Sequence, residues 1–177
     1  MKRGPYTITS TQDVYANPWI RIHEDKIVRP NGKDGIYGIV EYSGGVTTVA
    51  INDKHEVYLV KEYHYAVDEN GITLPGGGID KNESPLDAAK RELREESGVV
   101  AKNWIELGTA QPLPMIVNNT EYLFLATGAE IQVNHEEEFI LLTVSFDEAF
   151  EMVINGKIKH AASCIAILKA KEYVSKE

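Results

Sequence analysis

A short acidic segment constrains this chain more than any other feature. Residues 76–100 read GGGIDKNESPLDAAKRELREESGVV and carry six carboxylates. Ser84 followed by Pro85 predicts the start of a helix, because Ser caps helix N-termini and Pro suits the first helical position. Gly98 predicts its end in a left-handed conformation. We therefore expect a helix over residues 85–97, although like charges at helical spacing repel each other.

Three of these carboxylates would share one face of the helix. Glu92, Glu95 and Glu96 stand at positions i, i+3 and i+4, which span an arc of about 100°. A hard divalent cation such as Mg²⁺ or Mn²⁺ would offset their repulsion, since it takes oxygen ligands and is often completed by substrate phosphates. The alternative is a solvated acidic face with salt bridges, such as Arg91 with Glu95. The glycines at 76–78 would then be only a flexible turn.

Strand patterns dominate the first part of the chain. Residues 14–63 look rich in strands, and Val46–Ile51 should pair with Val57–Tyr63 as a hairpin. A long irregular loop is expected around residues 111–119. The other expected strands are Trp19–Ile22, Lys26–Val28, Gly35–Val40, Trp104–Leu107 and Glu121–Ala126.

Two further helices are expected late in the chain. One should start at a capping box beginning at Ser145 and end near Gly156. Another should cover about residues 161–174 and close the chain. Strands first, one helix in the middle and helices late predict an α+β sandwich.

The charge of the chain excludes some partners. The sequence has 27 acidic and 18 basic residues, with a net charge of −9. Such a surface disfavours nucleic acid and anionic membranes, both of which need a positive footprint. An anionic small molecule can still bind to an acidic protein if a metal ion stands between them.

A single cysteine, Cys164, excludes an intrachain disulfide and is consistent with a reducing compartment. It lies in an apolar run, where a buried small side chain is favoured over a nucleophile. Neither a signal peptide nor an apolar run long enough to span a bilayer is visible. We expect a cytoplasmic protein with no membrane association.

The spacing in the acidic segment resembles the Nudix box of the Nudix hydrolases. Gly77, five residues, Glu83, seven residues and then the run Arg91–Val99 match the motif at every defined position. The resemblance covers about residues 40–175 and implies a Nudix α/β/α sandwich. An extra N-terminal β-rich segment (residues 1–45) would serve dimerisation, and residues 46–177 would form the Nudix domain.

Several features resemble the ADP-ribose and nucleoside-diphosphate-sugar pyrophosphatases within that family. They are the N-terminal strands, the lead-in Thr73–Gly78 and the ending Asn155–Ser163. The resemblance implies Mg²⁺-dependent hydrolysis of a pyrophosphate bond in ADP-ribose or a nucleoside diphosphate sugar such as GDP-mannose. The products would be a nucleoside monophosphate and a sugar phosphate. It also implies a homodimer with exchanged N-terminal strands.

The resemblance implies roles for the residues of the box. The metal ligands would be Glu92, Glu95, Glu96 and the carbonyl of Gly76, with Mn²⁺ as a substitute for Mg²⁺. Arg91 would orient the carboxylates. The metal would make a bound water more acidic, so that it can attack phosphorus.

The residue that takes the proton of this water is open. Glu95 or Glu92 would be the base within the box. Relatives use an acidic loop before the late capping-box helix, which here contains Glu137, our first choice, followed by Glu136 and Glu138. The alternative for that loop is an ordinary solvated acidic turn.

Substrate-binding roles are predicted for Glu62, His64 and Pro114. His64 stands where relatives often carry an Arg that holds the substrate, so it is either a weaker phosphate contact or a surface residue. Pro114 belongs to a loop that departs from the Pro-Gly pair typical of ADP-ribose enzymes, so the nucleotide stays open. Tyr65, Trp19 and Tyr37 are either base-stacking residues or core or surface packing residues.

Two other functions are compatible with the fold. One is hydrolysis of coenzyme A, dinucleoside polyphosphates or nucleoside triphosphates. The other is a non-catalytic Nudix domain that senses a nucleotide, although the intact acidic positions of the box disfavour it.

Overall fold

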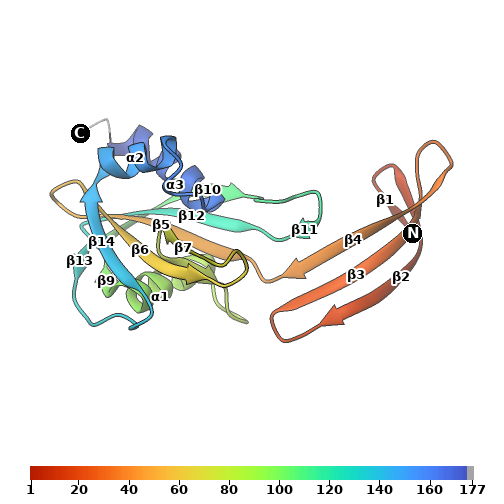
Figure 1. Cartoon of the computed structure of the whole chain (residues 1–177), viewed down its shortest axis with the longest axis horizontal. Coiled ribbons are helices and arrows are strands. Elements are labelled where there is room, and N and C mark those ends of the chain that lie inside the picture. Colours follow the sequence, from red (N-terminus) through yellow and green to blue (C-terminus); the bar gives the residue numbers. More distant parts are fainter. Residues whose placement is uncertain (175–177) are drawn as a thin grey trace. The chain divides into compact units, whose positions relative to one another are not determined.

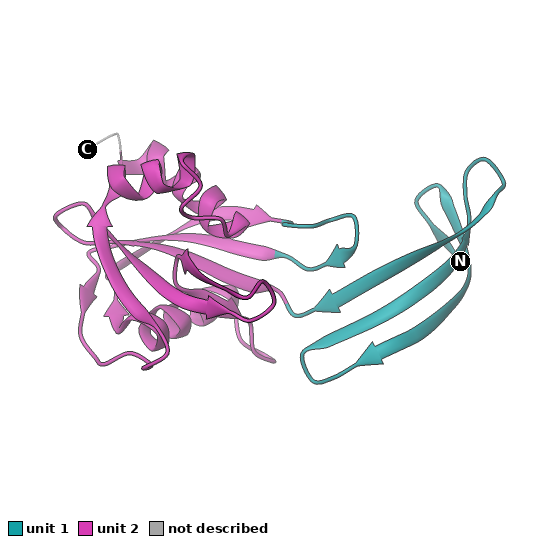
Figure 2. Cartoon of the chain, in the orientation of Figure 1, with its two compact units in different colours: residues 1–43, 111–120 teal, residues 44–110, 121–177 magenta. Residues whose placement is uncertain are grey.

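The computed structural model describes residues 1–174 and divides the chain into two compact units (Figures 1 and 2). Unit 1 contains residues 1–43 and 111–120. Unit 2 contains residues 44–110 and the chain from residue 121 onward. The domain boundary at residue 45 stays a prediction.

Unit 2 is built around a mixed sheet in the order β10-β12-β5-β6-β14, to which β7 adds by pairing with β6 and β8 by pairing with β5. The parallel pair β12–β5 lies next to antiparallel pairs. The strand bounds are β5 Gly45–Ile51, β6 Glu56–His64, β7 Glu69–Thr73, β8 Gly76–Gly78, β10 Asn103–Ala110, β12 Glu121–Thr127 and β14 Ile140–Ser145. A separate small sheet pairs β9 (Val99–Val100) with β13 (Glu130–Ile131).

The central strand β5 is buried along its whole length, which requires a cover on both faces of the sheet. Val49 and Ile51 pack into one core, with α2 (Phe146–Ile154) and α3 (Ala161–Val174). Val46 and Ala50 point to the other face, where α1 (Pro85–Ser97) packs. Alternate residues of one strand thus serve two cores, and the predicted α/β/α sandwich is confirmed (Figure 1).

All three predicted helices are present. In α1 the Ser84 hydroxyl accepts a hydrogen bond from the Asp87 N–H, and Gly98 ends the helix with φ 68°. Ser145 caps α2 in the same way, through the Glu148 N–H. The predicted hairpin is also present, although β5 and β6 pair only at Ile51 and Val57.

Unit 1 is a twisted sheet in the order β1-β2-β3-β4-β11. Its bounds are β1 Lys2–Arg3, β2 Tyr6–Ala16, β3 Ile20–Val28, β4 Asp34–Tyr42 and β11 Val117–Asn118. The two short strands expected within residues 19–28 form the single strand β3. The loop expected around residues 111–119 contains β11, which pairs parallel to β4. No helix within residues 1–174 is long and apolar enough to cross a membrane.

Candidate active site

The glycine turn at the start of the box is a short strand rather than a free loop. Gly76 and Gly77 in β8 pair with Thr47 and Val46 of β5. A Cβ on Gly76 would clash with the backbone oxygen of Val46, and one on Gly77 would meet the Glu92 carboxylate at 2.5 Å. Both positions therefore require glycine because other groups approach the backbone closely.

Arg91 connects this turn with the acidic face of α1. Its guanidinium donates two hydrogen bonds of 2.9 Å to Glu83 and one of 2.8 Å to the carbonyl of Gly78. Its Nη1 also lies 2.7 Å from Glu92 and 3.1 Å from Glu95. The hydrogen bond from Arg91 lowers the pKa of the Glu83 carboxyl. Such bidentate pairing fixes both the distance and the relative plane of the guanidinium and the carboxylate. Arg91 therefore holds the carboxylates in a fixed position relative to the glycine turn.

Glu96 is the most buried carboxylate of the box, with 7% of its surface exposed. Its Oε2 accepts a 2.9 Å hydrogen bond from the Gly76 N–H. Burial raises its pKa to about 8, against the effect of that hydrogen bond, and the charges of Glu92, Glu62 and Glu136 raise it further. The negative charges of Glu92, Glu62 and Glu136 therefore act together on the buried carboxyl of Glu96.

The chemistry of this donor set fits a divalent cation. Desolvation also raises the pKa of Glu92, opposed by its ion pair with Arg91. Two desolvated carboxyls, which offer only oxygen atoms as metal ligands, are typical of a site for a hard cation. Within residues 1–174, no three Asp, Glu, His or Cys side chains converge closely enough to hold a metal. The reason is local: Arg91 holds Glu92 and Glu95, whereas Glu96 turns toward Gly76.

The acidic loop after β13 lies against the C-terminal end of α1. The Glu136 N–H donates a 2.9 Å hydrogen bond to the carbonyl of Glu95. The charge of Glu136 also raises the pKa of the Glu96 carboxyl. Glu136 is exposed, and so are Glu137, the first choice from the sequence, and Glu138.

Two of the three predicted substrate-binding residues lie at the end of β6. His64 Nε2 lies 3.4 Å from Glu62 Oε1. The charge of Glu62 in turn raises the pKa of Glu96. The imidazole of His64 packs over Gly71, where a Cβ would overlap the ring. The third residue, Pro114, belongs to unit 1.

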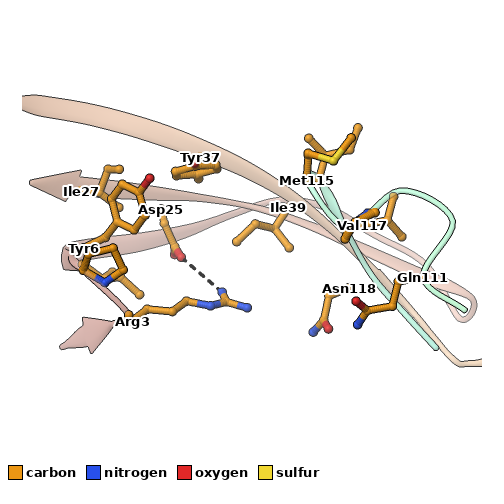
Figure 3. Close-up of a pocket in the computed structure, with 15 residues that line it drawn as sticks. Arg3, Tyr6, Asp25, Ile27, Tyr37, Ile39, Gln111, Met115, Val117 and Asn118 are labelled. Carbon is orange, nitrogen blue, oxygen red and sulfur yellow. Dashed lines mark ion pairs between the residues drawn. The ribbon is translucent and has the colours of Figure 1, made fainter. Parts of the chain in front are cut away.

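Unit 1 contains a cavity of about 500 Å³ between its sheet and the segment 111–118 (Figure 3). Tyr6 and Tyr37 line it as an edge-to-face pair with ring centroids 5.6 Å apart. The Arg3 guanidinium lies 3.9 Å from the buried carboxylate of Asp25 at its edge. Of the residues singled out from the sequence, Tyr37 and Pro114 line this cavity. Trp19 is 77% exposed.

Sequence reasoning missed two buried polar residues of unit 2. Ser163 of α3 is fully buried, and its Oγ accepts a 2.9 Å hydrogen bond from the Leu74 N–H. Glu121 of β12 is buried and accepts a 2.8 Å hydrogen bond from the Thr47 hydroxyl. Their sequence surroundings resemble ordinary helix and strand, so only the tertiary contacts mark them.

A sandwich in which one outer helix carries carboxylates, held by an Arg clamp beside a glycine turn, defines a Nudix-type hydrolase. A model of the NUDIX domain matches residues 41–163, so the chain belongs to the Nudix family and is a Nudix pyrophosphohydrolase. A model described as the nucleoside diphosphate sugar hydrolase N-terminal domain matches residues 6–40. The resemblance inferred from the box is thereby confirmed.

Similar proteins span nearly the whole chain. An ADP-ribose pyrophosphatase of Bacillus subtilis (strain 168) is 26% identical over 91% of each chain. A methanol dehydrogenase activator of Bacillus methanolicus is 25% identical over 89% of this chain and 88% of its own. The crystal structure of an ADP compounds hydrolase has a TM-score of 0.84 at 20% identity and covers 97% of this chain and 95% of that one. At that identity the structural likeness shows the fold.

Proposed function

We propose that this enzyme hydrolyses the pyrophosphate bond of ADP-ribose or of a nucleoside diphosphate sugar such as GDP-mannose. The reaction depends on Mg²⁺ and gives a nucleoside monophosphate and a sugar phosphate. The observation that carries the proposal is the arrangement of Glu92 and Glu96 against the Gly76–Gly77 turn, where negative charge gathers around a buried carboxyl. Relatives named ADP-ribose pyrophosphatase, which match both units, support the substrate class.

The residues proposed to hold the metal are Glu92, Glu95, Glu96 and the carbonyl of Gly76. Mn²⁺ is expected to substitute, because it takes the same oxygen ligands. When bound, the ion would neutralise pyrophosphate charge and make the attacking water more acidic. The role proposed for Arg91 is to orient Glu92 and Glu95, with which it is paired.

We assign the general base to Glu136, ahead of Glu137 and Glu138. In the proposed step the water oxygen bonds to phosphorus, its proton goes to the Glu136 carboxylate, and the bond to the bridging oxygen breaks. The support is the position of Glu136, whose backbone is tied to Glu95 and whose charge acts on Glu96. Glu95 remains the candidate base within the box.

Glu62, His64 and Pro114 are proposed substrate-binding residues. His64 lies beside Glu62 at the end of β6, where an imidazole N–H could donate a hydrogen bond to a phosphate oxygen. The nucleotide is expected to be a small molecule that reaches this acidic protein as a metal complex.

The chain is further proposed to act in the cytoplasm as a homodimer with exchanged N-terminal strands. The support for assembly is that unit 1 exposes large apolar side chains, among them Trp19, Ile36 and Met115. Light scattering should give the mass of two chains. A monomer at micromolar concentration would contradict this part of the proposal.

A substrate panel tests the central proposal. Purified enzyme is incubated with ADP-ribose, GDP-mannose, other sugar nucleotides, coenzyme A, dinucleoside polyphosphates and nucleoside triphosphates, with and without Mg²⁺. Turnover of ADP-ribose or a sugar nucleotide only with the metal is expected. Preferential turnover of another class would establish the alternative Nudix activity, and binding without turnover would establish the sensor.

A further inference from the structure

Three consecutive residues lead into the active-site turn, and each is anchored by a different element. The Leu74 N–H donates to Ser163 Oγ of α3 over 2.9 Å. The Pro75 carbonyl accepts a 2.9 Å hydrogen bond from the Thr48 N–H of β5. The Gly76 N–H donates to Glu96 of α1 over 2.9 Å. A run of three residues thus connects helices that cover opposite faces of the sheet.

The hydroxyl of Ser163 is the anchor on the α3 side, and it is fully buried. Proline has no N–H, so the amides of Leu74 and Gly76 are the two donors that this run can offer. The Leu74 N–H donates its hydrogen bond to Ser163, and the Gly76 N–H donates its hydrogen bond to Glu96. Because burial makes an unpaired N–H costly, Leu74 has little freedom to move away from Ser163.

His160 orients that hydroxyl. Its Nδ1 lies 2.9 Å from Ser163 Oγ. Since Oγ already accepts the Leu74 N–H, we assign its own proton to Nδ1, which is an acceptor in the neutral imidazole. His160 is exposed as a residue, yet its ring is desolvated. This desolvation is the main cause that lowers the pKa of His160, the charge of His64 is the second, and both favour the neutral form.

We propose that Ser163, oriented by His160, is a positioning residue for the active-site turn and keeps the Gly76 N–H aimed at Glu96 from the opposite layer of the sandwich. The role rests on the proposed hydrolysis only in its kinetic consequence, because the hydrogen-bond relay exists without substrate. Loss of the Ser163 hydroxyl should loosen Leu74, and through Pro75 it should loosen Gly76.

The test compares Ser163→Ala with Cys164→Ala, a neighbour on the same helix. Cys164 Sγ contacts the carbonyl of Ile158, away from the turn, so its removal controls for general loss of helix stability. Backbone amide hydrogen exchange is followed by NMR in the metal-free protein. In Ser163→Ala we expect the amides of Leu74 and Gly76 to exchange about tenfold faster relative to the core amide of Val49, as loss of one hydrogen bond allows. In Cys164→Ala the ratio should stay unchanged.

Kinetics provide the second measurement. Two matched variants at His160 test its role in orienting Ser163, and neither adds volume to the core. Asn at position 160 can present Oδ1 where Nδ1 lies, whereas Leu cannot accept a proton. We expect His160→Asn to retain slow exchange at Gly76 and nearly normal kcat. His160→Leu and Ser163→Ala should lower kcat about tenfold while KM changes less than about threefold, since the turn positions reacting groups rather than binding substrate alone.

One result would overturn the proposal: faster exchange at Leu74 with Gly76 unchanged, which would make Ser163 a local anchor. Equal exchange at Gly76 in His160→Asn and His160→Leu would remove the orienting role of His160. Failure of the proposed function is a separate result, because the exchange experiment uses neither substrate nor metal. An inactive wild-type enzyme with the expected exchange pattern would leave the positioning of Gly76 by Ser163 established.

Discussion

The backbone N–H of Gly76 donates a 2.9 Å hydrogen bond to Oε2 of Glu96, so the turn and the carboxylate helix are joined by direct contact. The bond supports the ionised form of a carboxyl whose pKa burial raises to about 8. A buried carboxyl with a raised pKa is costly to ionise without a partner. The cation proposed to bind here would offset this cost.

Replacement of Glu96 by Gln tests the proposed metal role. The amide keeps an oxygen that can accept the Gly76 N–H, so the fold should persist, whereas the charge that would bind the metal is lost. We expect kcat/KM to fall by roughly 100-fold or more, since even outer-shell partners of metal ligands are worth about 10–100-fold. A steady-state assay at saturating Mg²⁺ measures it. Glu172→Gln on the exposed face of α3 is the control, and unchanged turnover of Glu96→Gln would refute the metal role.

Arg91→Lys tests the clamp. Lys keeps the charge but cannot bond Glu83 with two parallel hydrogen bonds while also reaching Glu92 and the Gly78 carbonyl. We expect activity to fall by about 10–100-fold, as for other groups that orient metal ligands. We also expect a loss of about 1–3 kcal/mol in the free energy of unfolding, because hydrogen bonds to charged groups are lost. Urea denaturation and the same assay measure both, and wild-type values for Arg91→Lys would show that the ion pairs are incidental.

The loop glutamates give a prediction with an internal control. Glu136→Gln should lower kcat by about 100-fold or more with little change in KM, since general-base catalysis contributes about 10²–10⁴-fold. Glu137→Gln, which changes the same side chain one position along, should keep kcat within about threefold of wild type. Single-turnover kinetics measure the chemical step. A larger loss in Glu137→Gln than in Glu136→Gln would return the role to Glu137.

The elements that the sequence predicts well are those with local chemistry. The bounds of α1 follow from the cap at Ser84, Pro85 at the first position and Gly98 at the end. Each of these residues acts only on the helix turn next to it. The strand β2 (Tyr6–Ala16) is not among the individually expected strands, because nearly all its residues are exposed and polar residues interrupt its apolar alternation. β8 escapes prediction because three glycines carry no side-chain pattern, and only its pairing with β5 makes it a strand.

The site follows the same division. The spacing of Glu92, Glu95 and Glu96 is visible in the sequence because it is a helical repeat. The position of the acidic loop is not visible in the sequence, because it depends on contacts such as the hydrogen bond from the Glu136 N–H to the Glu95 carbonyl, across forty-one residues of chain. The burial of Glu121 is likewise a property of the assembled sheet, where its carboxylate lies against Gly45.

Glu121 gives a prediction about stability rather than activity. Burial raises the pKa of its carboxyl, and the hydrogen bond from the Thr47 hydroxyl opposes the shift. Between the ordinary carboxyl pKa of about 4.3 and the raised value, the folded protein therefore binds more protons than the unfolded chain. The contribution of Glu121 to stability is present below that window and is lost as the pH rises through it. Gln at this position does not titrate, so Glu121→Gln should gain stability relative to wild type as the pH rises.

We expect this difference between variant and wild type to grow from pH 4 to pH 8, because the unfolded wild-type chain loses the Glu121 proton at a lower pH than the folded protein does. Urea unfolding at a series of pH values measures it. Glu106→Gln on β10, where the side chain is exposed, is the control variant. A flat difference for Glu121→Gln would mean that the ionised Glu121 carboxylate is fully compensated within the fold.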